Sequence, residues 1–423
     1  MVSEKTSEEL YKERVQRLWD VINLRKPDRV PVAPFLGTFP SRYAGVTVAD
    51  YFFDIEKTVK AFEKTTVDFD FDACQFAPSS FSTGYVVKGL GMKQLKVSGI
   101  DLPQNAHFQW VQEKWVGPEW YDEFLCDPVD FGLRKYLPKV MDLFKPFELI
   151  PPLGLCLINP TYLLSLLTFL ADPEVSNAVE KLLVLAREHV KYARIVANAR
   201  KRLRDLGYPS FRNGSISVPY DMIYDYIRGT AINMDVFRVP EKIKEACKRI
   251  RQWITPIAIN GIKSLSSDLA PIPAIFIPLH AGHFLRPKMF EEFYWPDLKG
   301  IICDLGDNGI ISYVYFEYDW TPYLEYLKEL PKGKVVGIFE KAKMSEVKEK
   351  LGDVMCIGGG VPIELLSFGT PKEVKDHCKR VIKELGEDGG YILDCGIPLD
   401  YASKPENVRA MVESAREYGV YKS

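Results

Sequence analysis

Short apolar runs alternate with helical stretches along the last quarter of the chain. The apolar runs cover residues 310–317, 334–340, 353–357 and 390–395, and stretches with helical spacing lie between them at 320–330, 343–351 and 371–386. Near-continuous apolar strands that alternate with helices indicate a parallel sheet covered on both faces. In an eight-fold barrel of this kind, the chemistry gathers where the carboxyl ends of the strands meet.

The earlier part of the chain predicts further elements of the same fold. Strands are expected at 29–35, 71–77 and 274–280, and helices at 6–24, 47–64, 172–206 and 287–304. Residues 83–116 alternate Gly, Val and Lys with aromatic residues, which favours an antiparallel hairpin inserted over the barrel mouth. We therefore expect an α/β protein of one domain, 1–423, with an N-terminal helical extension (1–28) and an insertion at about 83–150.

Four of the apolar runs close on a residue that can do chemistry: Glu317, Glu340, Cys356 and Cys395. Cys356 lies 39 positions from both Glu317 and Cys395, about one or two strand–helix units on each side. One carboxylate and two thiols at three strand ends can meet around a zinc ion that keeps its fourth position open. The predicted metal ligands are Glu317, Cys356 and Cys395, with Glu340 as a candidate fourth ligand.

Other interpretations of the same residues stay open. A buried cysteine usually packs as a small hydrophobic residue, so both thiols can be inert core. A carboxylate at the end of an apolar strand is harder to dismiss, because burying it without a partner is costly. The alternating Asp68, Asp70 and Asp72 are expected to form an exposed or cap-forming acidic turn.

The strand at 274–280 ends in a histidine pair, His280 and His283. This spacing on a helix would indicate two metal ligands, but in a strand-to-loop transition it also fits histidines that line a pocket. We expect His280, Glu317 and Glu340 to be catalytic. Because side chains alternate along a strand, Tyr313 and Tyr315 share a face with Glu317, and we expect them and His283 to bind substrate.

The composition describes a soluble globular protein with ample core. The chain is 47% hydrophobic and 26% charged, with a net charge of −2, which argues against nucleic acid or an anionic membrane as partner. No apolar segment follows the first residues, and the stretch 161–170 is too short to span a bilayer. Eight scattered cysteines suit a reduced cytoplasm, where we expect the protein to work.

Several runs resemble the uroporphyrinogen decarboxylase superfamily, in its corrinoid-dependent methyltransferase branch. They are DRVPV at 28–32, FLRPKMFEEF at 284–293, PENVRAM at 405–411 and EYGVY at 417–421. The resemblance covers most of the chain and is strongest from about 274 to 421. It implies a (β/α)8 TIM barrel with an N-terminal extension.

The resemblance also bears on the metal. Thiol methyltransferases of this family bind zinc through a His-x-Cys on one strand and a Cys on the last strand. Here Tyr315-Phe316-Glu317 occupies the His-x-Cys place and Cys395 matches the distal Cys, so Cys356 would supply the missing ligand. True decarboxylases of the family carry an arginine-rich N-terminal motif, of which only Arg42 remains nearby.

These features imply a zinc-dependent methyltransferase that moves a methyl group from a methoxylated, aromatic donor to the Co(I) of a corrinoid. The chain has no Asp-x-His-x-x-Gly motif, so the corrinoid (cobalamin) is expected on a partner protein. A homodimer is also compatible with the sequence. The alternatives are methyl transfer between methylcobalamin and a thiol, a cofactor-free decarboxylase, and a non-catalytic protein that binds a corrinoid or tetrapyrrole.

Overall fold

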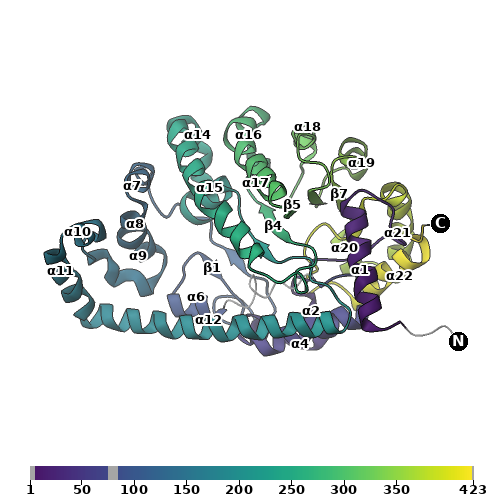
Figure 1. Ribbon diagram of the computed structural model, residues 1–423, viewed down its shortest axis with the longest axis horizontal. Coiled ribbons are helices and arrows are strands. Elements are labelled where there is room, and N and C mark those ends of the chain that lie inside the picture. Colours follow the sequence, from purple (N-terminus) through teal and green to yellow (C-terminus); the bar gives the residue numbers. More distant parts are fainter. Residues whose placement is uncertain (1–4, 75–83, 422–423) are drawn as a thin grey trace.

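The computed structural model describes residues 5–74 and 84–421. In Figure 1 the strands lie toward the right beneath an arch of helices, and a long helix runs along the lower edge to two short helices at the far left. The last residues of the predicted strand at 71–77 and the start of the predicted insertion fall at 75–83, outside the described residues.

Six strands form one parallel sheet, and all but the short first strand are almost completely buried. In spatial order they are β3 (Gly214–Ser215), β4 (Ala274–Leu279), β5 (Ile311–Phe316), β6 (Val335–Phe339), β7 (Cys356–Gly360) and β8 (Tyr391–Asp394). The apolar runs of the sequence produce them, because a strand covered on both faces has no solvent side on which to place polar residues.

Two further extended segments, around Val32 and Cys74, close the sheet into a barrel. The amide of Leu393 in β8 donates to the carbonyl of Pro31 at 2.9 Å, and the amide of Asp72 donates to the carbonyl of Val32 at 2.9 Å. The amide of Cys74 donates to the carbonyl of Pro209 at 2.9 Å, ahead of β3. The expected (β/α)8 barrel is thus confirmed, with a short ladder at the first strand because its prolines lack an N–H.

Helices surround the barrel and fill the long insertion. Before the insertion they are α1 (Ser7–Ile22), α2 (Phe39–Ala44), α3 (Val48–Phe53) and α4 (Ile55–Phe69). After β3 they are α13 (Pro219–Ile223), η3 (Tyr224–Arg228), η4 (Gly229–Ala231), α14 (Ile232–Arg238), α15 (Pro240–Lys263), η5 (Gly282–Phe284), α16 (Pro287–Phe293), α17 (Trp295–Asp307), η6 (Thr321–Tyr323), α18 (Leu324–Leu327), α19 (Met344–Leu351), α20 (Ile363–Phe368), α21 (Pro371–Gly386) and α22 (Pro405–Tyr418).

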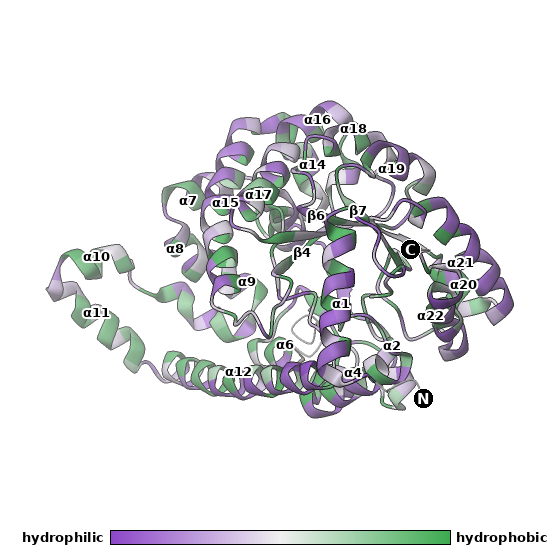
Figure 2. Ribbon diagram, turned by 45° about the vertical axis from the view of Figure 1, so that its right-hand side comes forward, coloured by the Kyte–Doolittle hydropathy of each residue, from purple (hydrophilic) through white to green (hydrophobic). Residues whose placement is uncertain are grey.

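The insertion contains a small antiparallel hairpin and a helical extension. Its elements are α6 (Gly84–Leu90), β1 (Leu95–Lys96), β2 (Gln109–Trp110), α7 (Trp120–Cys126), α8 (Pro128–Asp130), η1 (Phe131–Tyr136), α9 (Leu137–Val140), η2 (Asp142–Leu149), α10 (Leu153–Ile158), α11 (Pro160–Ala171) and α12 (Pro173–Asp205). Figure 2 shows polar residues on the outer faces of the barrel helices, with apolar residues turned inward. None of the helices in the described ranges is both long and apolar enough to cross a membrane.

Strand β7 differs from its prediction. The sequence places a strand at 353–357 that ends near Cys356, whereas the observed strand begins there and continues through Gly358, Gly359 and Gly360. A Cβ on Gly358 would lie 2.2 Å from a methyl group of Ile338 in β6, so the strand needs glycine to fit against its neighbour. The glycine run that reads as a turn is therefore part of the strand.

A buried ionic cluster holds the first two barrel strands together. The carboxylate of Asp72, only 1% exposed, accepts hydrogen bonds from Arg17 at 2.6 Å, Arg29 at 2.7 Å and the amide of Val32 at 2.8 Å. Arg17 also binds Asp28. The expectation of an exposed acidic turn at 68–72 is thus wrong for Asp72, because the turn is placed where two arginines from α1 and the first strand reach it.

Asp72→Asn should lower the free energy of unfolding by ~3–5 kcal/mol, because it leaves two largely buried guanidinium groups without their shared carboxylate. Urea unfolding of wild type and variant measures the difference. The control is Glu325→Gln, which removes an exposed carboxylate bound to Lys328 and Lys350 and should change stability far less.

The pH dependence gives an independent check. Burial works to raise the pKa of Asp72, but the charges of Arg29 and Arg17 outweigh it and hold the pKa below its usual range. The stabilisation is therefore present above the usual aspartate pKa of ~3.9 and is lost as the pH falls through the lower folded pKa. A stability difference between wild type and Asp72→Asn that grows on acidification would contradict this assignment.

Candidate active site

A cavity of about 470 Å³ opens at the carboxyl ends of β4 and β5. Side chains of the insertion cover it, since Leu95 and Trp110 of the β1–β2 hairpin line it together with Val86 and Val87 of α6. Its wall is rich in rings, contributed by Phe35, His107, Phe108, Trp110, Tyr226, Phe276 and Tyr315. A mostly apolar, ring-lined space of this volume is typical of a small-molecule site.

His280 and Glu317 bring ionisable side chains to this cavity from the ends of β4 and β5. Nδ1 of His280 lies 2.6 Å from Oδ2 of Asp225, and its Nε2 lies 3.5 Å from Oε1 of Glu317. Burial works to lower the pKa of His280, but the contacts with Asp225 and Glu317 outweigh it and raise the pKa well above its usual value. The imidazole is thus held protonated between two carboxylates, facing the cavity.

Asp221 fixes the backbone that carries His280. Its carboxylate, fully buried, accepts from the amide of Ala281 at 2.8 Å and from the hydroxyl of Tyr294 at 2.6 Å. Burial raises the pKa of Asp221 to about 7. Asp221 and Asp225 lie one turn apart, on α13 and on the π-helical turn η3, so one short segment both orients the ring and anchors its backbone.

Arg212 brings a second cation to the cavity wall. The Cζ atom of its guanidinium lies over the ring of Phe276, 3.5 Å from the ring centroid, and 4.4 Å from the centroid of Phe35. Burial lowers the pKa of this guanidinium to about 9. These two adjacent, mutually tilted rings hold the guanidinium in the wall.

The predicted substrate-binding tyrosines differ in position. Tyr315 lines the cavity, and its buried hydroxyl has no hydrogen-bond partner among the described residues. Burial raises the pKa of Tyr315 well above its usual value, so the hydroxyl stays a donor. Tyr313 lies deeper in the barrel, edge-on to Phe211 at 5.3 Å. His283 stacks on Tyr318 at 4.3 Å, and burial lowers its pKa.

Glu340 and Cys395 lie at the carboxyl ends of β6 and β8 but line a different cavity, of about 310 Å³. Oε2 of Glu340 accepts from the amide of Tyr318 at 2.6 Å. The thiol of Cys395 donates to the carbonyl of Ile397 at 2.8 Å, and burial raises its pKa well above the usual range. Of the predicted residues, the structure therefore joins His280, Tyr315 and Glu317 in one cavity and places Glu340 and Cys395 in another.

Cys356 does not meet the other predicted metal ligands. Cys356 begins β7, where it pairs with Val336 of β6. The residues just before Glu317 and Cys395 align with Gly359 and Gly360, at the other end of β7. That is a separation of at least three residues, roughly 10 Å along the strand. Burial raises the pKa of the Cys356 thiol far above its usual range. The error lies in the misplaced strand, which puts the residue at the amino end of the barrel.

The residues present do not fit the predicted zinc site. Within 5–74 and 84–421, no three His, Cys, Asp or Glu side chains are grouped closely enough to hold a metal ion. Cys356 faces the wrong end of the barrel, and Cys395 and Glu317 serve different cavities. Zinc binding stays a prediction that no contact among these residues supports.

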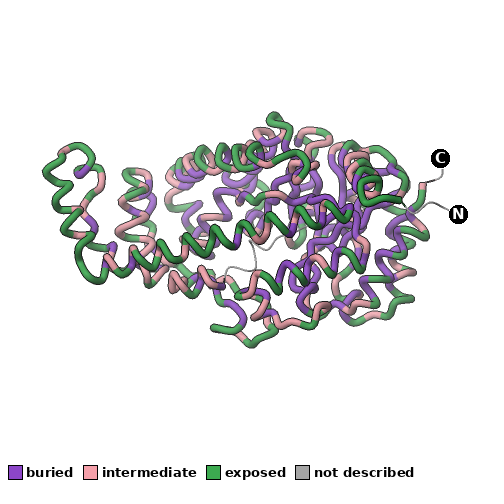
Figure 3. Tube along the Cα trace, turned by 60° about the horizontal axis from the view of Figure 1, so that its bottom comes forward, coloured by how far each residue is buried: buried purple, intermediate pink, exposed green. Residues whose placement is uncertain are grey.

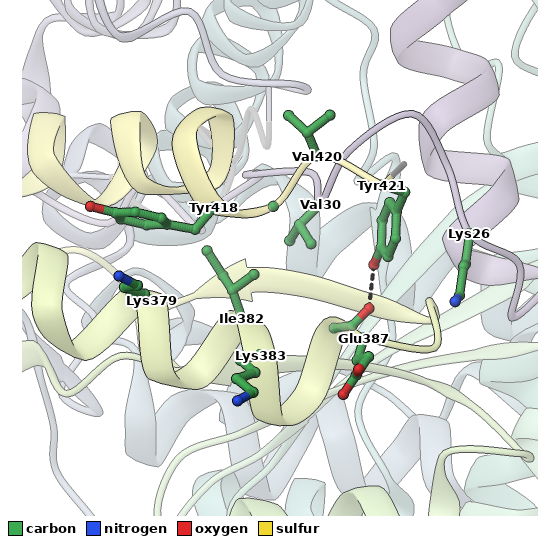
Figure 4. A pocket seen from close by; sticks show the side chains of 11 residues that line it. Lys26, Val30, Lys379, Ile382, Lys383, Glu387, Tyr418, Val420 and Tyr421 are labelled. Carbon is green, nitrogen blue, oxygen red and sulfur yellow. Dashed lines mark hydrogen bonds between the residues drawn. The ribbon is translucent and has the colours of Figure 1, made fainter. Parts of the chain in front are cut away.

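A third cavity, of about 520 Å³, lies at the opposite, amino end of the barrel. Figure 4 shows Lys26, Lys379 and Lys383 around an apolar floor that includes Val30 and Ile382, beside the last turn of α22. The lysines are exposed at its rim. None of the residues predicted for chemistry lines this cavity.

Sequence reasoning missed Asp225 and Arg212, although both shape the mouth cavity. Asp225 belongs to a π-helical turn, which has no recognisable sequence pattern. Arg212 precedes a strand of only two residues, so no apolar run points to it. Tyr226, the residue after Asp225, also lines the cavity.

The chain is similar to known proteins in sequence and in fold. The family model described as "Uroporphyrinogen decarboxylase (URO-D)" matches residues 171–418. Uroporphyrinogen decarboxylases of Coxiella burnetii are 23% identical over 143 residues, 33% of this chain and 39% of theirs. The corresponding protein of Magnetococcus marinus is 21% identical over 143 residues, 33% of this chain and 40% of its own. The match thus spans about two fifths of the length of these curated relatives.

A solved structure shares the fold over nearly its whole length. It is a "methyltransferase from Methanosarcina mazei", with a TM-score of 0.61 and 14% sequence identity, and the match covers 96% of this chain and 98% of that one. At this level of identity the likeness establishes the barrel fold with its surrounding helices. It places the chain in the same architecture as a protein that carries that name.

Cys356→Ser should leave the metal content of the purified protein unchanged, because the thiol is buried at the amino end of the barrel, away from Glu317 and Cys395. Elemental analysis of wild type and variant measures it. Cys378→Ser, at an equally buried thiol of α21, is the matched control for packing loss. Selective loss of zinc from Cys356→Ser would contradict the placement of this residue.

His280 should make the protein less stable as the pH rises. Its folded pKa lies above the unfolded value of ~6.5, so its stabilisation is full below that value and is lost as the pH rises through the folded pKa. Asp221, with its pKa raised to about 7, acts in the same direction. The difference in unfolding free energy between wild type and His280→Asn isolates the histidine and should shrink with rising pH. A difference that grows would overturn the protonated assignment.

Proposed function

The chain belongs to the uroporphyrinogen decarboxylase family, since the family model covers more than half of it, and we propose that it is a methyltransferase of that family. Its methyl donor is a methoxylated aromatic compound, and its acceptor is the Co(I) of a corrinoid on a separate protein. The observation that carries the proposal is His280, held protonated by Asp225 and Glu317 at the mouth of a ring-lined cavity.

The cavity suits an aromatic ether. Rings such as Phe276 and Trp110 offer flat apolar faces, and about 470 Å³ accommodates one substituted benzene ring. The hydroxyl of Tyr315, without a partner among the described residues, is a donor for a polar substituent of the ring. A buried hydroxyl left without a partner is costly, and a bound ligand removes that cost.

Removal of a methyl group from an aryl ether needs a proton for the oxygen that departs. The Co(I) of the partner protein's corrinoid, a substrate of the reaction, would supply the electron pair that forms the bond to the methyl carbon, and the electron pair of the broken carbon–oxygen bond would stay on the oxygen. Nε2 of His280 donates its proton to that oxygen, and the donor leaves as a phenol. Asp225 holds Nδ1 and so keeps Nε2 pointed into the cavity, while Glu317 stabilises the charged ring before transfer.

The walls of the cavity exclude water and orient the substrate. Closing the cavity with the β1–β2 hairpin keeps water away from the ether oxygen and holds the ring in one orientation. The corrinoid protein approaches over the strand ends near residue 317, because the methyl group must face it. The name of the Methanosarcina mazei neighbour is consistent with this activity.

Decarboxylation is the second candidate, and Arg212 is the observation that favours it. A cation in the cavity wall, stacked on Phe276, can hold a substrate carboxylate. Against it, Arg42 donates to the backbone carbonyls of Tyr401 and Ala402 and is not among the residues of the cavity wall. A cavity of about 470 Å³ is also small for a four-ring macrocycle.

Mixing the protein with a reduced corrinoid protein and a panel of methoxyarenes should consume Co(I) absorbance and release the matching phenol. His280→Gln should slow transfer by ~10²–10⁴-fold, the usual contribution of a general acid. His189→Gln, at an exposed histidine of α12 outside the cavity, is the matched control and should leave the rate unchanged.

The leaving group distinguishes acid catalysis from a structural defect. A donor whose phenol is acidic, such as a nitro-substituted anisole, needs little protonation, so His280→Gln should slow it far less than an unsubstituted anisole. Equal loss for both donors would contradict the assigned proton transfer. Release of CO2 from a porphyrinogen, with no transfer from any methoxyarene, would favour the decarboxylase instead.

A further inference from the structure

The extension at the far left of Figure 1 carries an unusual surface. We call residues 149–171 the arm; it contains helices α10 and α11 and is continuous with the amino end of α12. Figure 3 shows the tip of the molecule there almost entirely exposed, in contrast to the buried strands of the barrel. The arm lies far from the barrel in the views of Figures 1 to 3.

Only one side of the arm is packed within the chain. A small core of Phe147, Ile150 and Ala178 joins it to η2 and α12, and Leu166 and Phe169 of α11 pack against that core. None of the twelve residues of α11 is buried. A helix that is apolar all round belongs in a buried position, so the second side of α11 lacks the cover that its sequence requires.

The uncovered side consists of large apolar residues. Leu157 is 85% exposed and Ile158 is 83% exposed. The other exposed apolar residues of the arm are Leu149, Leu155, Tyr162, Leu163, Leu164, Leu167 and Leu170. A fully exposed aliphatic side chain presents on the order of 100 Å² of surface to water. Together these partly exposed residues present on the order of 500 Å² of apolar surface. Exposed apolar surface of this extent on one short segment marks an interaction surface.

The arm lacks the side chains that hold a surface helix on anionic lipids. The arm contains no Lys, Arg, Asp, Glu or Trp over its 23 residues, and the nearest charges on its flanks are acidic: Glu148, Asp172 and Glu174. Helices that lie on membranes carry Lys and Arg for anionic headgroups and Trp for the interface.

The absence of charged side chains from the arm also argues against a transient partner. Non-obligate interfaces are about as polar as the rest of a protein surface, whereas homodimer interfaces are more apolar. An arm without charges must be covered whenever the protein is in water. Another copy of the same chain is always present at the concentration of the chain itself, and two-fold symmetry lets the same patch serve both sides.

We propose that the arm is the self-association surface of this protein, with the arm of one chain packed against the arm of a second. Two copies would bury on the order of 1,000 Å² of apolar surface, the lower bound for a specific interface. The contact places the two barrels at opposite ends of an elongated dimer. Both barrel mouths then remain away from the contact.

Sedimentation equilibrium of the full chain in detergent-free buffer tests the proposal. Wild type should have twice the 48.3 kDa mass of one chain. The double substitution Ile158→Glu with Leu164→Glu should raise the dimer dissociation constant more than tenfold and give a mass of 48.3 kDa, because each contact would bury opposed carboxylates. Ile257→Glu, at an isoleucine of α15 that is 71% exposed, is the matched control and should stay dimeric.

Each other outcome overturns the proposal. A monomeric wild type would show that the arm is not a self-association surface, whatever the variants do. A double variant that stays dimeric and keeps the wild-type circular dichroism would place the contact elsewhere. Flotation of wild type, and not of the double variant, with phosphatidylcholine or phosphatidylserine vesicles would assign the arm to a membrane.

Discussion

The carboxylate of Asp72 joins the two strands at which this barrel begins. The first strand contains Pro31 and Pro34, which offer no N–H, so an ordinary ladder between it and its neighbours is short. Asp72 replaces the missing hydrogen bonds with one to the amide of Val32 and with ion pairs to Arg17 and Arg29. The position of every later strand, and so of the cavity at their carboxyl ends, depends on that closure.

Much of the fold could be predicted because the strands of a parallel sheet covered on both faces appear in the sequence as continuous apolar runs. Strands β4, β5, β6 and β8 coincide with apolar runs, and α12 begins and ends within a residue of its expected limits. Strand β7 could not be placed, because Gly358 is required by the nearby Ile338, a tertiary contact without a local signal. Cys356 was assigned to the mouth on the strength of that misplaced strand.

The candidate site shows the same division between local and long-range information. His280 and Glu317 could be found because they end strands, and parallel strands bring their carboxyl ends together. Asp225 could not, because its part in the site comes from a π-helical turn 55 residues before the histidine that it holds. The equal spacing of Glu317, Cys356 and Cys395 along the chain is a coincidence. Residues at equal intervals in sequence need not lie at the same end of their strands.

Closure between the first and last strands sets an order for folding. The bond between Pro31 and Leu393 spans 362 residues, and the antiparallel bridge from Arg29 reaches Val420. During synthesis the first strand therefore waits for nearly the entire chain before it gains one of its two neighbours. High contact order of this kind slows folding and leaves a sheet edge open to wrong pairings. The ionic cluster of Asp72 joins segments no more than 55 residues apart, so it can keep the first two strands paired with each other until β8 emerges from the ribosome.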